Sequence, residues 1–323
     1  MVALYARQGP RRWRALKRPN LPGYSFESHF VAIGDERMHY LDEGPYDGDF
    51  PAPDTLLLLH GNPSWSYLYR KMIPLLSERY RVVAPDLIGF GLSTKRADIS
   101  SYSIQRHVND IEALIDHLGI NRLTVVGQDW GGPIGCAFAA MHVSSPGIAR
   151  RVVDKLILMN TYVPGYPLDF PALSLIYDKP WSRLVIQRLD LFRRVAFRWG
   201  CRSRLSKQKR EAYLMPHRIW QERAGIVAFA RCIPRRGGRG EWSLLDVIDT
   251  WMRSTEIPKL LIYGDRDPVF RVRRAQKLSQ EMRAVTFEVL TGAGHFIQED
   301  RGEDAASRIL EWLEVGEKTN DRA

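Results

Sequence analysis

The stretch Val125–Gly132 places a carboxylate where the backbone is expected to turn sharply. An apolar, β-branched run precedes Asp129 and a run of small residues from Pro133 to Met141 follows it, which predicts a strand, a tight turn and a helix. Nearby glycines permit the turn, which would raise the Asp129 side chain beside the positive end of the helix. This pattern is typical of a nucleophile elbow, here with aspartate at its tip. A carboxylate forms a stable ester only by attacking a saturated carbon or a strained ring, so the leaving group decides the chemistry.

Two further groups at predicted strand ends could complete a catalytic set. Asp267 follows one apolar run and His295 follows the next, so the chain order is nucleophile, acid, histidine, as in α/β hydrolases. A histidine beside an acid can take a proton from water, while the acid fixes the tautomer of the imidazole. Asp265 competes for the role of the acid. We favour Asp267 because it lies further into the loop.

Two neutral N–H donors are expected beside Asp129. Trp130 follows it directly, and an indole N–H donates without accepting. Asn62, in His60–Pro63 at the end of another predicted strand, adds a side-chain amide. Neutral donors suit a weakly hydrated leaving anion such as chloride or bromide. A cation would instead pair with Asp129 and lower its nucleophilicity. The backbone N–H groups of Asn62 and Trp130 could also form an oxyanion hole for ester hydrolysis.

Apolar runs alternate with helical patterns along the chain, which predicts an α/β fold. We expect a hairpin over 30–43 and buried strands over 55–59, 81–84, 123–127, 155–159, 259–263 and 285–290. Helices are expected over 66–79, 103–118, 133–141, 173–200, 211–233 and 297–313. Such alternation implies a mostly parallel sheet of eight strands flanked by helices, with chemistry at the carboxyl ends of the strands.

The predicted domains follow from where this alternation breaks. Between 161 and 253 the pattern is helical, rich in arginine and without strand-like runs, which indicates an inserted helical cap. The core would then comprise 26–160 and 254–315. Residues 1–25 read as a basic, disordered extension, with a transit peptide as the alternative, and 316–323 as a tail.

Four motifs resemble those of haloalkane dehalogenases. They are His60–Arg70, Asp86–Ser93, Gly127–Pro133 and His295–Asp300. The similarity extends from about Phe26 to Leu313, and the pairing of Asn62 with Asp129 and Trp130 makes it more specific than an elbow alone.

This resemblance implies an α/β-hydrolase fold with a cap, and a covalent mechanism. Asp129 would attack the carbon that carries the halogen, and Asn62 and Trp130 would hold the departing halide. His295, oriented by Asp267, would activate a water that hydrolyses the alkyl ester and releases an alcohol. The resemblance implies no metal and no organic cofactor. The partners would be a halogenated alkane and water.

The family varies in the position of the acid and of the second halide donor. Some members have a glutamate after the sixth strand, where this chain has Asn160-Thr161, so the acid must come later. Other members take the second donor from a cap tryptophan, for which Trp181 is the candidate. Because Asn62 already fills that role, we expect Trp181 to pack in the cap. The combination resembles the subfamily with an Asp-His-Asp triad and an Asn-Trp halide pair.

Two alternatives remain open. An epoxide hydrolase also uses an elbow aspartate but needs an acid to protonate the opening oxygen, for which the cap offers Tyr162, Tyr166, Tyr177 and Tyr213. We favour a dehalogenase because epoxide hydrolases of this type usually have a bulky apolar residue where this chain has Asn62. A non-catalytic ligand-binding homologue is the other alternative, and the intact set of catalytic groups argues against it.

Composition and charge bear on whether the protein binds nucleic acid and on its compartment. The formal net charge is +10, of which +6 falls within residues 1–26 and +9 within 162–250. No nucleic-acid-binding motif accompanies these basic residues, so a solvated arginine-rich surface is favoured over nucleic-acid binding. Basic tail and cap could mediate self-association or contact with anionic surfaces. Three cysteines without metal-ligand spacing, and no apolar run long enough to span a bilayer, favour the cytoplasm.

Overall fold

The computed structural model describes residues 21–45, 54–142, 152–161, 180–233 and 242–320. The first 20 residues of the predicted extension, residues 162–179 and 234–241 of the predicted cap and the final three residues of the predicted tail lie outside the described residues. Packing against the core begins before the expected boundary at residue 26, because Leu21 and Tyr24 contact a buried aromatic cluster that includes Trp65.

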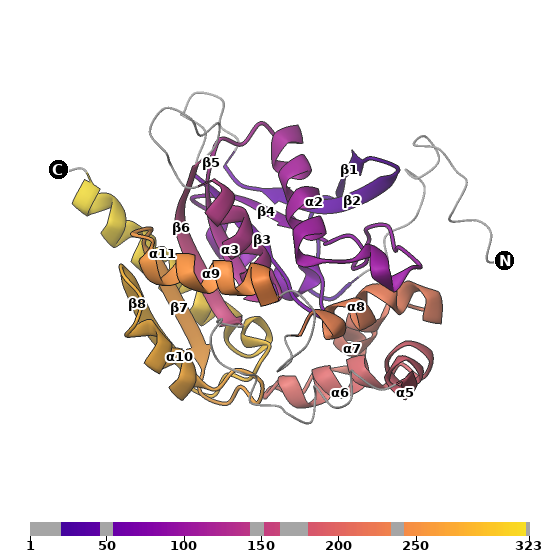
Figure 1. The fold of residues 1–323 in the computed structure, drawn as a ribbon. Coiled ribbons are helices and arrows are strands. Elements are labelled where there is room, and N and C mark those ends of the chain that lie inside the picture. Colours follow the sequence, from indigo (N-terminus) through magenta and orange to yellow (C-terminus); the bar gives the residue numbers. More distant parts are fainter. Residues whose placement is uncertain (1–20, 46–53, 143–151, 162–179, 234–241, 321–323) are drawn as a thin grey trace.

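An eight-stranded sheet forms the centre of the molecule. Its strands are β1 (His29–Ile33), β2 (Glu36–Glu43), β3 (Thr55–Leu59), β4 (Arg81–Pro85), β5 (Arg122–Asp129), β6 (Val152–Thr161), β7 (Lys259–Gly264) and β8 (Val285–Leu290). They are ordered β1-β2-β4-β3-β5-β6-β7-β8, and only the β1–β2 and β2–β4 pairs are antiparallel. The predicted mostly parallel α/β-hydrolase sheet is therefore confirmed (Figure 1).

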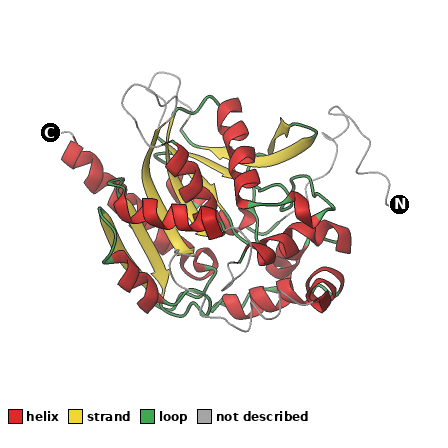
Figure 2. Ribbon diagram, viewed as in Figure 1, coloured by secondary structure: helices red, strands yellow, loops and turns green. Residues whose placement is uncertain are grey.

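Helices cover both faces of this sheet (Figures 1 and 2). Along β3, Leu57 and Leu59 join one hydrophobic cluster while Leu56 and Leu58 join the other, as expected when alternate side chains point to opposite faces. One face packs against α2 (Ile104–His117), α3 (Gly131–Met141), α9 (Trp242–Ser254) and α10 (Val272–Ser279). The other packs against α1 (Ile73–Leu76) and α11 (Ile297–Asn320). Burial on both faces explains the uninterrupted apolar runs of the strands.

Short helices gather at one end of the sheet (Figure 1). They are α5 (Pro180–Arg183), the π-helical turn η4 (Leu184–Arg188), α6 (Leu191–Gly200), α7 (Lys207–Leu214), the 3₁₀ turn η5 (Trp220–Arg223) and α8 (Ala224–Cys232). The predicted cap range also includes α9, which packs on α3 of the core. None of the described helices is both long and apolar enough to cross a membrane.

Three predicted helices are broken, each for a local reason. The helix expected over 66–79 is a 3₁₀ turn η2 (Ser66–Tyr69) followed by α1, because Pro74 lacks the N–H that an earlier start would need. The helix expected over 211–233 stops at Leu214, two residues before Pro216. Within the range 173–200, Asp190 has a φ of 55°, which separates η4 from α6.

A buried ionic cluster joins the cap to the core. Arg70 Nη1 contacts Glu299 Oε1 while its guanidinium stacks on Tyr67 with 4.0 Å to the ring centroid. From α7 the hydroxyl of Tyr213 donates to Glu299 Oε1 at 2.5 Å. The side chains of Arg70 and Glu299 are 2% and 0% exposed, so each charge depends on the other for compensation.

Replacing Glu299 with alanine should lower the free energy of unfolding by about 3–5 kcal/mol, because Arg70 would remain buried without its carboxylate. The matched control is Glu314→Ala, which removes the partner of Arg79 in an exposed pair and should cost less than about 1 kcal/mol. Urea unfolding followed by circular dichroism measures both. Equal losses in the two variants would contradict this account.

Candidate active site

The elbow predicted at Asp129 is present at the junction of β5 and α3. Asp129 has a φ of 52°, in the left-handed region, and α3 begins two residues later at Gly131. This costly conformation persists because strand and helix fix the backbone on either side. The end of β3 lies close by: a Cβ built on Gly61 would lie 2.3 Å from Asp129 Cβ and Oδ1. Only glycine at position 61 therefore lets these two strand ends come together.

Two backbone N–H groups hold the Asp129 carboxylate. Asn62 N–H donates to Oδ1 at 2.7 Å, and the Trp130 N–H also donates to this side chain. These are the two groups expected to form an oxyanion hole. Burial raises the pKa of Asp129 above its usual value, and the charge of His295 and these two N–H donors offset only part of that rise. The donors therefore favour the ionised form, which is the form that can attack carbon.

His295 lies between two carboxylates. Its Nδ1 is 3.1 Å from Asp267 Oδ2, and its Nε2 is 3.7 Å from Asp129 Oδ2. The other oxygen of Asp267 accepts from the backbone N–H of Val269 at 2.6 Å, which fixes its orientation. Asp265, the competing candidate, accepts from the Gly292 N–H at 2.7 Å instead. The structure thus brings Asp267 rather than Asp265 to the imidazole.

The pKa of His295 reflects these neighbours. Burial lowers the pKa, but the charge and hydrogen bond of Asp267, together with the charge of Asp129, outweigh burial and raise it above its usual value. A proton on Nδ1 facing Asp267 leaves Nε2 as the basic nitrogen. Gln128 Nε2 lies 3.4 Å from His295 Nε2 and 3.3 Å from the His295 carbonyl oxygen. This side of the ring is therefore the one able to accept a proton.

The side chains of Asn62 and Trp130 are both held by α8. Asn62 Nδ2 donates to the Ile226 carbonyl oxygen at 3.2 Å. The Trp130 ring stacks on Phe229 with centroids 5.3 Å apart and ring planes 16° from parallel. Phe229 in turn stacks on His107 at 4.9 Å. The cap thereby fixes the two predicted N–H donors, although sequence reasoning named neither Ile226 nor Phe229.

Sequence reasoning also missed the role of Asn160 at the end of β6. Its Nδ2 donates to the carbonyl oxygens of Gly294 and His295 at 2.6 and 3.0 Å, and its Oδ1 accepts from the Gly264 N–H at 2.8 Å. Asn160 thus ties the loop that carries His295 to the end of β7. Asn160 stands at the end of a predicted strand, where some members of the resembled family carry a glutamate. That position was the signal in the sequence that could have revealed its role.

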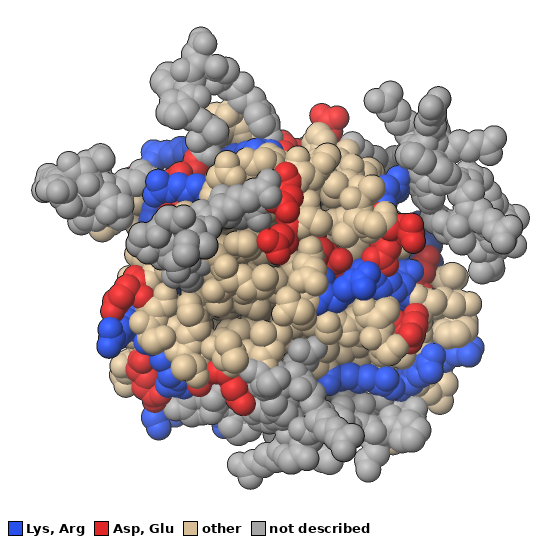
Figure 3. Space-filling view, turned by 45° about the horizontal axis from the view of Figure 1, so that its top comes forward, with Lys and Arg blue, Asp and Glu red and all other residues tan. Residues whose placement is uncertain are grey.

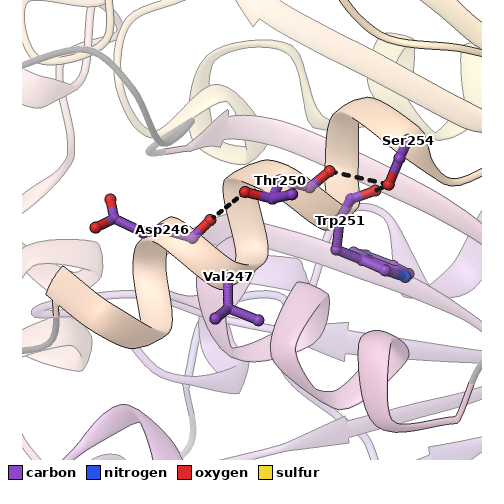
Figure 4. A pocket seen from close by; sticks show the side chains of 5 residues that line it. All are labelled: Asp246, Val247, Thr250, Trp251 and Ser254. Carbon is purple, nitrogen blue, oxygen red and sulfur yellow. Dashed lines mark hydrogen bonds between the residues drawn. The ribbon is translucent and has the colours of Figure 1, made fainter.

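Other features contribute no catalytic group. The side chain of Trp181, expected to pack in the cap, is 49% exposed on the short helix α5, so that expectation was wrong. Among the described residues no set of three or more His, Cys, Asp or Glu side chains is placed to hold a metal ion. A pocket on α9, lined by Asp246, Val247, Thr250, Trp251 and Ser254, contains none of the predicted site residues (Figure 4).

Comparison with known proteins places this geometry in a family. Residues 54–302 match the family described as alpha/beta hydrolase fold, and the chain belongs to it. A haloalkane dehalogenase of Psychrobacter cryohalolentis is 34% identical over 91% of this chain and 94% of its own length. A cis-3-alkyl-4-alkyloxetan-2-one decarboxylase of Xanthomonas campestris is 31% identical over 91% of this chain and 98% of its own.

Solved structures agree with this placement. The crystal structure of haloalkane dehalogenase DbeA from Bradyrhizobium elkani matches with a TM-score of 0.81 at 26% identity, covering 91% of this chain and 100% of that one. These relatives confirm the predicted enzyme class, a hydrolase that acts on carbon–halogen bonds.

Replacing Asp267 with asparagine should lower the pKa of His295 by about one to three units, because the imidazolium loses an adjacent negative charge. The acidic limb of any step that needs neutral His295 would then move to lower pH. A ring-proton NMR titration of His295 measures the shift directly. Asp265→Asn is the matched control and should leave the His295 titration in place, so a similar shift in both variants would count against the pairing.

Proposed function

We propose that the protein hydrolyses haloalkanes to an alcohol, a halide ion and a proton through a covalent alkyl ester on Asp129. One observation carries the proposal. A buried carboxylate accepts from two backbone N–H groups, that of Asn62 at Oδ1, while its Oδ2 lies 3.7 Å from a histidine paired with Asp267. Trp130 and Asn62 add neutral donors beside it, and the dehalogenase relatives support the same reading.

The first step uses the oxygen that the backbone leaves available. Oδ1 of Asp129 accepts from the Asn62 N–H, so Oδ2 is the attacking atom. A C–O bond forms as the C–X bond breaks, and the halide leaves with the bonding electrons. The indole N–H of Trp130 and the second amide hydrogen of Asn62, whose first is donated to Ile226, stabilise that developing charge.

The second step hydrolyses the ester. Alkylation removes the charge of Asp129, so the pKa of His295 falls and its Nε2 becomes the free base, while Asp267 still orients the ring. A water loses its proton to Nε2 and attacks the ester carbonyl carbon. The resulting oxyanion develops on Oδ1, which already accepts from the Asn62 N–H, and the Trp130 N–H also donates to this carboxylate. On collapse the C–O bond to the alkyl group's oxygen breaks, that oxygen takes the proton from the His295 imidazolium to leave as the alcohol, and the new carboxyl group of Asp129 loses its proton to restore the carboxylate. These steps call for no metal or organic cofactor.

A decarboxylase acting on a β-lactone is the second candidate. The Xanthomonas relative carries that name at 31% identity, and a strained four-membered ring is also open to attack by a carboxylate. The epoxide-hydrolase alternative is weaker. Tyr213 is buried and donates to Glu299, so it is not available to protonate an epoxide oxygen. Tyr162, Tyr166 and Tyr177 lie outside the described residues.

Incubation with 1,2-dibromoethane and a series of 1-bromoalkanes in weak buffer should release bromide and acid in equal amounts. Asp129→Ala should lower the rate by at least about 10³-fold, because no other described side chain replaces the nucleophile. Ion chromatography measures the bromide.

Styrene oxide and a cis-3,4-dialkyloxetan-2-one are assayed in parallel. Absence of bromide release together with Asp129-dependent conversion of the lactone to alkene and carbon dioxide would replace the dehalogenase proposal with the second candidate. Asp129-dependent hydrolysis of styrene oxide without bromide release would replace it with the epoxide-hydrolase alternative.

A further inference from the structure

Exposed apolar side chains concentrate on one part of the cap. Twelve large apolar side chains are exposed among the described residues, and six of them fall within residues 181–199. These six are Trp181, Leu184, Leu189, Leu191, Val195 and Trp199. Exposed apolar residues that occur singly need no explanation, but such a cluster usually marks a surface that binds something.

Helix α6 shows this surface most clearly, because large apolar side chains lie on its exposed face while an arginine is buried on its inner face. Its inner face buries Arg193, Phe197 and Gly200. On the opposite face, Leu191, Val195 and Trp199 recur at i, i+4 and i+8, and all three are exposed. Trp199, at 70% exposure, is the most exposed of the large apolar side chains among the described residues.

Arginine fills the positions between these apolar side chains. Arg194 and Arg198 lie on the exposed face of α6 beside Leu191, Val195 and Trp199. The segment 181–204 contains seven arginines and a single acid, Asp190. Asp190 is buried and bonded to Arg193 at 2.6 and 2.7 Å, and it also lies 3.7 Å from Arg194 Nε, so it offsets only part of the positive charge of this segment. On the face shown in Figure 3, Lys and Arg side chains occur together with Asp and Glu side chains.

We propose that this face of the cap, formed by α5, η4 and α6, docks on the surface of an anionic lipid bilayer. Tryptophan and leucine would enter the interface between headgroups and acyl chains, and arginine would pair with lipid phosphates. The exposed face of α6 carries arginine and no acid, whereas at α5 the exposed Asp98 lies near Arg183. The charge complementarity that selects an anionic surface is therefore that of α6.

Other occupants fit this face less well. A nucleic acid would pair with the arginines but would leave Leu191, Val195 and Leu184 without a partner, since phosphate contacts need no aliphatic side chains. A second copy of the chain would have to place this arginine-rich face against itself in a two-fold dimer, which like charges oppose. The inference does not rest on the proposed reaction.

Sedimentation of the full chain with vesicles tests the proposal. Binding to phosphatidylcholine vesicles with about one third phosphatidylglycerol should exceed binding to pure phosphatidylcholine, and should weaken at high salt as the charges are screened. Arg194→Gln with Arg198→Gln should lower the partition coefficient by about 25-fold, at roughly fivefold per arginine. Val195→Ser with Trp199→Ser should lower it at least about tenfold.

The matched control variant changes the same residue types elsewhere. Val247 is 60% exposed on α9 and the Arg106 side chain is 55% exposed on α2, so Val247→Ser with Arg106→Gln should bind vesicles like the unmodified protein. Circular dichroism and thermal unfolding confirm that every variant is folded.

Three outcomes overturn the proposal. In the first, anionic vesicles bind no better than neutral ones, or the cap variants bind as well as the unmodified chain, which would assign binding to another basic segment. In the second, sedimentation velocity shows an oligomer that Val195→Ser with Trp199→Ser dissociates. In the third, an RNA or DNA oligonucleotide binds with the same dependence on Arg194 and Arg198 and none on Trp199.

Discussion

The hydrogen bond from the Asn62 N–H to Asp129 Oδ1 joins the ends of two adjacent parallel strands, β3 and β5. It forms only because residue 61 lacks a Cβ, which would otherwise overlap the Asp129 side chain. The same bond orients the carboxylate so that Oδ2 faces His295. Before ester formation the Asn62 N–H stabilises a carboxylate, and afterwards the same group would stabilise an oxyanion at the same oxygen. One piece of backbone geometry thus serves both steps of the proposed reaction.

The cap contributes to this site through backbone and ring contacts rather than through catalytic groups. The Ile226 carbonyl oxygen holds the Asn62 amide, and Phe229 stacks on Trp130, so both proposed halide donors depend on the position of α8. A buried ionic cluster of Arg70, Glu299 and Tyr213 joins α7 to the core at a second point. A cap anchored at two places can fix the donors on one side and present an exposed face on the other.

Much of the core could be predicted from the sequence because its signals are local. Continuous apolar runs mark strands buried on both faces, and polar residues directly after them mark the edge where Asp129, Asp267 and His295 meet. The pairing of His295 with Asp267 rather than Asp265 was predicted from loop position alone, and the structure shows that contact.

The contacts missed from sequence depend on long-range packing. Asn160 bonds residues more than 100 positions away, and Phe229 meets Trp130 only because the cap folds back over the core. No periodicity within α8 reports which of its apolar residues faces an indole. Pro74 and Pro216 were visible in the sequence as helix-breaking residues, but the prediction followed the apolar pattern instead. Exposure of Trp181 could not be read from its sequence neighbours.

The central claim is that Asp129 becomes covalently alkylated, and intact-mass spectrometry of a His295→Gln variant tests it most directly. After exposure to a 1-bromoalkane, this variant should gain one alkyl group per chain and release one bromide, because the first step proceeds without the base that clears the ester. Peptide mapping should place the group on Asp129, and Asp129→Ala with His295→Gln should gain nothing. Bromide release with no gain in mass, or an alkyl group on another residue, would contradict the account.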